Sequence, residues 1–162
     1  VWTVLHGCGT AVAVLAGQRH GAGDPAGVRR VAAAGWRLVA VVAGVPLLAG
    51  LIGTAPAVGL LVDDPAVAGA VTPAVVLLAW AQVVLMAAIT VSNGLVRATG
   101  DTRTGLRASL LAEYAVFVPL GLLLCQVWRG GLVGLYLAHL LYWAAYLAVV
   151  AHRRHRLAAA HR

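Results

Sequence analysis

Five long apolar segments dominate this sequence and limit what it can fold into. A helix needs about 20 residues to cross a hydrocarbon layer about 30 Å thick, and the segments have roughly that length. Lipid offers no partner to a backbone N–H or C=O, so each segment is predicted to be α-helical. We therefore expect an all-α fold, a polytopic membrane helix bundle with about five transmembrane helices, over roughly residues 1–17, 32–55, 68–96, 106–127 and 131–151.

The balance of residue types excludes an ordinary soluble domain. Hydrophobic residues make up 62% of the chain and charged residues only 10%, whereas a soluble domain has about 25% charged residues because its surface faces water. The formal net charge of +7 comes from arginine alone among the basic residues. Because these arginines lie mainly in short connections and form no continuous basic face, we expect no nucleic-acid partner.

The arginines alternate between the two ends of the predicted helices. Three lie in residues 18–30, none in 56–67, three in 97–107, one in 128–130 and four in the tail 152–162. Cytoplasmic connections of membrane proteins carry the excess of arginine. This pattern predicts a multi-pass membrane protein with a basic cytoplasmic tail at residues 152–162 that lies near anionic lipid. We expect the membrane to be the cell (plasma) membrane.

Two of the arginine-rich connections have similar sequences. Residues 21–30 and 98–107 share small residues, a Gly-Asp pair and trailing arginines. We expect the glycine to end one helix in the left-handed conformation and Asp24 or Asp101 to cap the next helix through its carboxylate. Pro25 suits the first turn of a helix, and Arg97 suits the negative end of its helix dipole. These loop residues are therefore predicted to be mainly structural.

The same loops also resemble signatures of a known family. Residues 17–25, Gly-Gln-Arg-His-Gly-Ala-Gly-Asp-Pro, are similar to the "GQ..GAGD" motif of multidrug and toxic compound extrusion (MATE) transporters, and residues 93–103 are similar to its "G.LRG.GDT" motif. Asp-Asp-Pro at 63–65 resembles the Asp-Pro of the intervening connection. The matching motif residues are Gly17, Gln18, Gly23, Asp24, Gly94, Arg97, Gly100, Asp101 and Thr102.

The resemblance implies a larger architecture and a function. The chain would correspond to helices eight to twelve of a twelve-helix transporter and form part of one of its two lobes, with the missing N-terminal lobe as its partner. Such transporters exchange drugs or other amphipathic or cationic organic compounds for Na⁺ or H⁺, so we expect no cofactor besides the coupling ion. Because the sequence has no His or Cys cluster with metal-ligand spacing and no phosphate-binding loop, we also expect no metal site and no enzymatic activity. Some members carry an acidic residue eleven positions before the motif arginine, where this chain has Met86.

Charged side chains at membrane depth are costly and point to function. Glu113 is the single acid inside a predicted segment, about 12 Å along its helix from residue 105. There it would resist ionisation and could bind a proton, or neighbouring helices could simply hold it neutral. His139, flanked by Tyr136, Tyr142 and Tyr146, could line a cavity for a cationic aromatic compound or pack against another helix.

Two further polar stripes have helical spacing. One comprises Gln82, Met86, Thr90, Asn93 and Arg97, and the other comprises Thr3, His6 and Thr10. Polar residues aligned in this way should face the interior of the bundle. The candidates for a substrate or ion pathway are therefore Glu113, His139, Tyr142, Gln82, Met86 and Asn93.

Three alternatives to a drug exporter stay open. A flippase for lipids or lipid-linked oligosaccharides of the same superfamily would share the architecture, and a wide cationic cavity would favour it. A membrane-embedded enzyme would require His6, Glu113 and His139 to converge within hydrogen-bonding distance. An inactive fragment is the third alternative. In the preferred hypothesis the partners are a small-molecule substrate, membrane lipid and the second lobe.

Overall fold

The computed structural model describes residues 1–61, 63–127, 129 and 131–159. The described residues are helical apart from short connections and contain no strand. The elements are α1 (Trp2–Gly21), α2 (Pro25–Leu61), α3 (Pro65–Ala70), α4 (Pro73–Ala98), α5 (Arg103–Leu111), the π-helical η1 (Ala112–Phe117), α6 (Val118–Leu122), the π-helical η2 (Leu123–Val127) and α7 (Gly131–Ala159). The all-α bundle expected from the sequence is confirmed.

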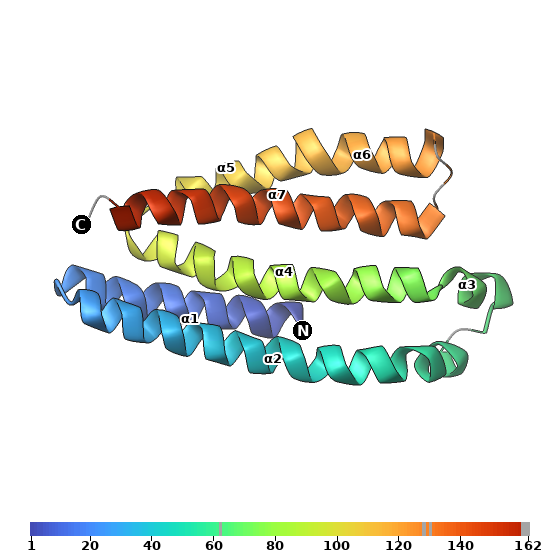
Figure 1. The fold of residues 1–162 in the computed structure, drawn as a ribbon, viewed down its shortest axis with the longest axis horizontal. Coiled ribbons are helices and arrows are strands. Elements are labelled where there is room, and N and C mark those ends of the chain that lie inside the picture. The colour runs from blue at the N-terminus through green and yellow to red at the C-terminus, as the bar shows by residue number, and fades with distance from the viewer. Residues whose placement is uncertain (62, 128, 130, 160–162) are drawn as a thin grey trace.

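The long helices run side by side, and α4 occupies the middle of the bundle (Figure 1). α4 packs against α1 and α2 on one side and against α7 on the other, and α7 in turn packs against α5 and η1. The α1–α2 and α4–α5 connections and the C-terminus lie at one end of the bundle, whereas α3 and the start of α7 lie at the other (Figure 1). The arginine-rich segments are therefore gathered at one end, as their alternation along the sequence predicted.

Four stretches of the described residues have the length and apolar composition of a membrane span: Pro25–Thr54, Pro73–Ala98, Arg103–Gln126 and Gly131–Leu157. In an 18-residue window of the first of them only 11% of the residues are buried inside the chain, so few of its side chains there are covered by other helices. Ile52, for example, is 83% exposed. An outer surface this apolar suits lipid as the surrounding solvent.

The sequence predicted about five transmembrane helices, and α1 accounts for the difference. α1 forms a helix of 20 residues but is not one of the four candidate spans. Its composition explains this, because His6, Thr10, Gln18 and Arg19 interrupt the apolar residues. α1 is nevertheless held in the bundle by its packing against α4 and α2.

The connection between the second and third predicted segments differs from its expected place. α2 continues beyond residue 55 to Leu61, and α4 begins at Pro73 rather than at residue 68. Residues 65–70 form the short helix α3 because the Asp64 carboxylate accepts a hydrogen bond from the backbone N–H of Ala66 at 2.8 Å. Thr72 caps α4 in the same way through Val75 N–H, at 3.4 Å. Local capping thus divides an apolar run that hydropathy alone leaves continuous.

The predicted segments 106–127 and 131–151 also differ in detail. The first contains two π-helical turns, η1 and η2. Pro119, which has no backbone N–H to continue the ladder of hydrogen bonds, is the second residue after η1. α7 extends through most of the predicted tail to Ala159, whereas residues 160–162 lie outside the described part of the chain. The described part of the tail is thus the continuation of a helix.

Near the arginine-rich end, side-chain contacts hold α7 against its neighbouring helices. The Arg154 guanidinium donates a hydrogen bond to the Ser92 hydroxyl at 3.3 Å and lies 5.9 Å from the ring centre of Trp36. Ser92 is only 1% exposed. One guanidinium therefore joins α7 to α4 and α2.

Two clusters of buried side chains share α4. One joins it to α1 and α2, and the other joins it to α5, η1 and α7. The helices α1 and α4 approach closely, because a Cβ atom built on Gly94 would lie 2.8 Å from the carbonyl oxygen of Gly9. Small residues at such contacts let membrane helices pack backbone against backbone.

Candidate functional site

A cavity of about 300 Å³ lies between α1, the C-terminal half of α4, α5 and α7. Its walls combine aromatic rings, hydroxyl groups, an amide and a guanidinium: Trp2, His6, Gly9, Thr10, Ile89, Thr90, Asn93, Gly94, Arg97, Ser109, Tyr142, Trp143 and Tyr146. The volume falls at the lower end of the range for small-molecule sites, about 300–1,000 Å³. The cavity is therefore the candidate site for a small compound.

One wall of the cavity is built from stacked and tilted rings. The Trp143 ring centre lies 5.7 Å from that of Trp2 on α1 and 4.8 Å from that of Tyr142, with an edge-on angle of 75° in the second pair. Tyr146 continues this wall, 6.4 Å from Trp143. Aromatic pairs at these separations are favourable and hold one another in place. The wall offers ring faces to an aromatic ligand.

Polar groups make up much of the rest of the cavity wall and also meet its ring wall at Tyr146. Asn93 donates a hydrogen bond from Nδ2 to the Tyr146 hydroxyl at 3.2 Å, and Thr10 donates one to the backbone carbonyl of His6 at 3.1 Å. Two buried atoms in these walls, Asn93 Oδ1 and Trp143 Nε1, have no hydrogen-bond partner among the described residues. Unsatisfied buried polar atoms are costly and need an explanation such as a bound molecule or water.

Several residues singled out in the sequence meet in this cavity. Asn93, Gly94, Arg97 and Tyr142 line it, and Thr90, His6 and Thr10 from the two polar stripes line it as well. Their common location follows from helical spacing, since residues three and four apart share one face. The stripes of α1 and α4 thus face each other, with α7 opposite.

Other candidates lie elsewhere in the bundle. Gln82 is only 6% exposed and donates a hydrogen bond to the backbone carbonyl of Tyr136 at 3.3 Å. Met86 packs against a buried cluster that includes Leu5, Val39 and Val91. Neither side chain lines the described cavity. Both link α4 to a neighbouring helix, and their part in a pathway stays a prediction.

Glu113 and His139 also lie outside the lining. Glu113 is half-buried in η1 and acts electrostatically on His139, whose ring packs 5.3 Å from Phe117 and 5.6 Å from Trp143. Among the described residues, no hydrogen bond joins any two of His6, Glu113 and His139. The convergence that a membrane-embedded enzyme would require is therefore not found in the described chain.

Trp2, Trp143 and Ser109 line the cavity, but the sequence did not identify them. A signal existed for two of them, because Trp2 precedes His6 by four residues on the same face and Trp143 lies within the stripe of tyrosines on α7. Ser109 carried no such signal, since a single serine in an apolar helix most often has only a local role.

The two Gly-Asp connections are capped as the sequence predicted. Gly23 and Gly100 have φ angles of 66° and 81°, the left-handed conformation that glycine adopts without strain. The Asp24 carboxylate accepts a hydrogen bond from Gly27 N–H at 2.7 Å, and the Asp101 carboxylate accepts one from Thr104 N–H at 3.0 Å.

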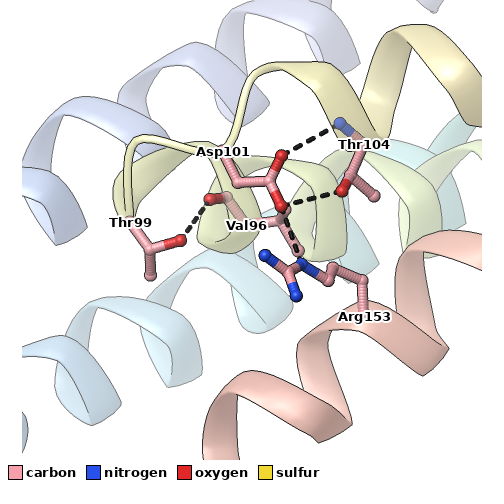
Figure 2. Close-up of polar contacts among 5 residues, drawn as sticks. All are labelled: Val96, Thr99, Asp101, Thr104 and Arg153. Carbon is pink, nitrogen blue, oxygen red and sulfur yellow. Dashed lines mark hydrogen bonds and ion pairs between the residues drawn. The ribbon is translucent and has the colours of Figure 1, made fainter.

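Asp101 has a further partner, shown in Figure 2. Its Oδ2 atom accepts hydrogen bonds from the Thr104 hydroxyl at 2.8 Å and from Arg153 Nε at 2.7 Å. Desolvation by itself would raise the pKa of Asp101, but the hydrogen bonds from Arg153 and Thr104 outweigh it and lower the pKa to about 2. The carboxylate is therefore ionised at neutral pH and links the α4–α5 connection to α7.

The other motif residues have local roles. Gly17 lies where α1 passes the end of α4, and a Cβ atom there would make an ordinary van der Waals contact with the Ala98 carbonyl oxygen at 3.7 Å. The Gln18 carbonyl accepts a hydrogen bond from Ala22 N–H at 3.1 Å, and Thr102 N–H donates one to the Gly100 carbonyl at 3.1 Å. These contacts shape the turns.

Comparison with known proteins adds one finding. The family model described as MatE matches residues 1–125, which include α1 through α6 and both Gly-Asp connections. No curated protein and no solved structure matches the chain.

Proposed function

This chain belongs to the MatE family of membrane transporters, and we propose that it forms part of a secondary-active exporter of amphipathic organic compounds. Export would be driven by exchange with Na⁺ or H⁺ across the cell membrane. The single observation that carries the proposal is the cavity of about 300 Å³ inside the bundle, whose walls combine aromatic rings with polar side chains. Such a mixture suits a compound with an apolar body and a polar group.

The proposal includes an orientation and a partner. The arginine-rich ends of α1, α4 and α7 would lie in the cytoplasm, because arginine accumulates on that side of a membrane. The cavity would then open between this bundle and a second lobe of the complete transporter. Movement of one bundle against the other around a central site gives alternating access.

Glu113 is the proposed coupling group. It is the single acid within the four candidate spans, and it lies half-buried beside His139. Charged side chains inside membrane spans are costly and often mark ion pathways, so this carboxyl group is the proposed site of exchange with Na⁺ or H⁺. The cavity and the coupling group would then be separate, and conformational change would connect them.

The complete transporter, produced in cells that lack their own exporters, tests this function. We expect ethidium efflux that depends on a Na⁺ or proton gradient, and we expect Glu113→Gln to abolish the dependence on the gradient. Tyr114→Phe is the matched control, since Tyr114 is the neighbouring residue and is 70% exposed. Unchanged coupling in Glu113→Gln would remove that residue from the mechanism.

The flippase alternative is tested in the same system. Arg97 is the one arginine among the described residues that line the cavity, which does not make the wide cationic cavity expected for a lipid-linked headgroup. Movement of a fluorescent lipid across vesicles containing the transporter, together with an absence of dye efflux, would favour the flippase.

A further inference from the structure

We propose that the cavity binds aromatic organic anions in preference to aromatic cations, with the anionic group held by Arg97 and the ring held by the α7 aromatic side chains. This inference deepens the proposed function, on which it rests, by naming the preferred substrate class, and it makes an aromatic cation such as ethidium a weaker ligand of the same cavity. Its starting point is the charge of the cavity wall. Arg97 is the residue with a permanent charge in that wall, and no acid lies among the described lining residues.

The five acids of the chain are all placed away from the cavity. Asp24 pairs with Arg19 and Arg30, Asp63 and Asp64 lie at the far end of α2, and Glu113 lies beside His139. Asp101 is only four residues from Arg97, but its carboxylate binds Arg153 and Thr104 instead. Within the described chain, no carboxylate therefore lies within ion-pair distance of the Arg97 guanidinium.

An unpaired guanidinium beside a cavity is a specific recognition group. Arginine presents a planar set of donors that matches a carboxylate, sulfonate or phosphate. Ser109 and Tyr142 line the same cavity and carry hydroxyl groups that can donate to such an oxygen. Arg97 also acts electrostatically on Tyr146, whose hydroxyl accepts the Asn93 bond. The polar part of the cavity thus combines neutral hydrogen-bond donors with the positive charge of Arg97.

The ring wall could also attract a cation. This attraction must be compared with the attraction of an anion to Arg97. A cation over a tryptophan or tyrosine face gains a modest electrostatic attraction. The same cation would be repelled by Arg97 in the wall of this cavity of about 300 Å³, and because Arg97 is exposed, water weakens the repulsion without reversing its sign. An anion gains the charge-assisted hydrogen bonds and lacks this repulsion, while its ring gains the same stacking on Trp143. The wall therefore favours an anion.

Direct binding to the complete transporter, purified in detergent, tests the inference. The probes are naphthoate and naphthylmethylammonium, which share one ring system and differ in charge, and calorimetry measures their dissociation constants. We expect naphthoate to bind roughly tenfold more tightly, the scale of one charge-assisted hydrogen bond. Arg97→Gln should remove this preference and Arg97→Lys should keep part of it. Arg103→Gln, which removes an exposed arginine outside the cavity, is the matched control.

Equal or tighter binding of the cation to the unmodified transporter would overturn the inference, and this result needs no variant that must fold. An equal loss of both probes in Arg97→Gln would overturn the role of that residue. Gradient-driven ethidium efflux without naphthoate binding would refute the inference and leave the proposed function intact. Naphthoate binding through Arg97 without transport of any compound would refute the function and leave the binding site.

Discussion

The two Gly-Asp connections have similar sequences but different positions in the bundle. Each has a glycine in the left-handed conformation and an aspartate that caps the following helix. Asp24 finds its arginines within its own connection, at 3.6 and 3.5 Å, with Arg19 and Arg30 side chains 57% and 73% exposed. Asp101 pairs with Arg153, fifty-two residues away, at 2.7 Å, and its side chain is only 16% exposed.

The difference shows how one local motif acquires two energetic roles. Exposed ion pairs contribute little because water screens them and the long side chains lose entropy. A pair with a less exposed carboxylate and a remote partner also restrains two elements that the chain connects only distantly. The first connection is therefore a local turn, whereas the second ties α7 to the α4–α5 connection (Figure 2).

The largest expected effect is on Asp101. Asp101→Ala removes the cap of α5 and the ion pair to α7, so we expect the free energy of unfolding to fall by about 2 kcal/mol. Asp24→Ala is the matched control and should cost about 1 kcal/mol, since it loses a cap and only exposed ion pairs. Thermal unfolding of both variants in detergent measures the difference. Equal losses would mean that the Arg153 contact adds nothing.

The glycines should respond alike, because their strain is local. Gly23→Ala and Gly100→Ala each place a side chain at a positive φ angle with open space around the new Cβ atom. We expect each substitution to cost about 1 kcal/mol. The same unfolding assay compares the two variants. A cost that is clearly larger at Gly100 would show that the second connection is strained as a whole.

The smallest expected effect is that of acid on the Asp101 pair. The pKa of Asp101 is lowered from 3.8 to about 2 in the folded chain, so the folded state favours the ionised form. The stability from this pair is fully present above pH 3.8 and is lost as the pH falls through about 2. We expect a loss of less than about 1 kcal/mol, because Arg153 is partly exposed and solvent screens the pair.

Comparing unfolding at pH 4 and pH 2 in the unmodified chain and in Asp101→Asn isolates this effect. The variant should lose less stability between those two values, because its side chain does not titrate. The same loss in both proteins would assign the acid sensitivity to other groups.

The candidate site could be predicted only in part. Helical spacing indicated which residues of α1 and α4 share a polar face, and Asn93, Arg97 and Tyr142 do line one cavity. The same spacing could not separate them from Gln82 and Met86, which contact neighbouring helices instead. A polar face indicates that a side chain points toward the interior of the bundle. Whether that side chain lines a cavity or contacts another helix depends on how the neighbouring helix packs.

The sequence alone determined the helical fold, the apolar surface, the gathering of arginine at one end and the capped turns. These depend on hydropathy, backbone pairing in lipid and residues adjacent in the chain, so no distant contact is needed to predict them. Only the tertiary structure decided that Asp101 meets Arg153, that Arg154 reaches Ser92 and Trp36, and that rings from α1 and α7 close one cavity. Such contacts depend on the relative rotation and depth of separate helices, which packing of whole surfaces sets.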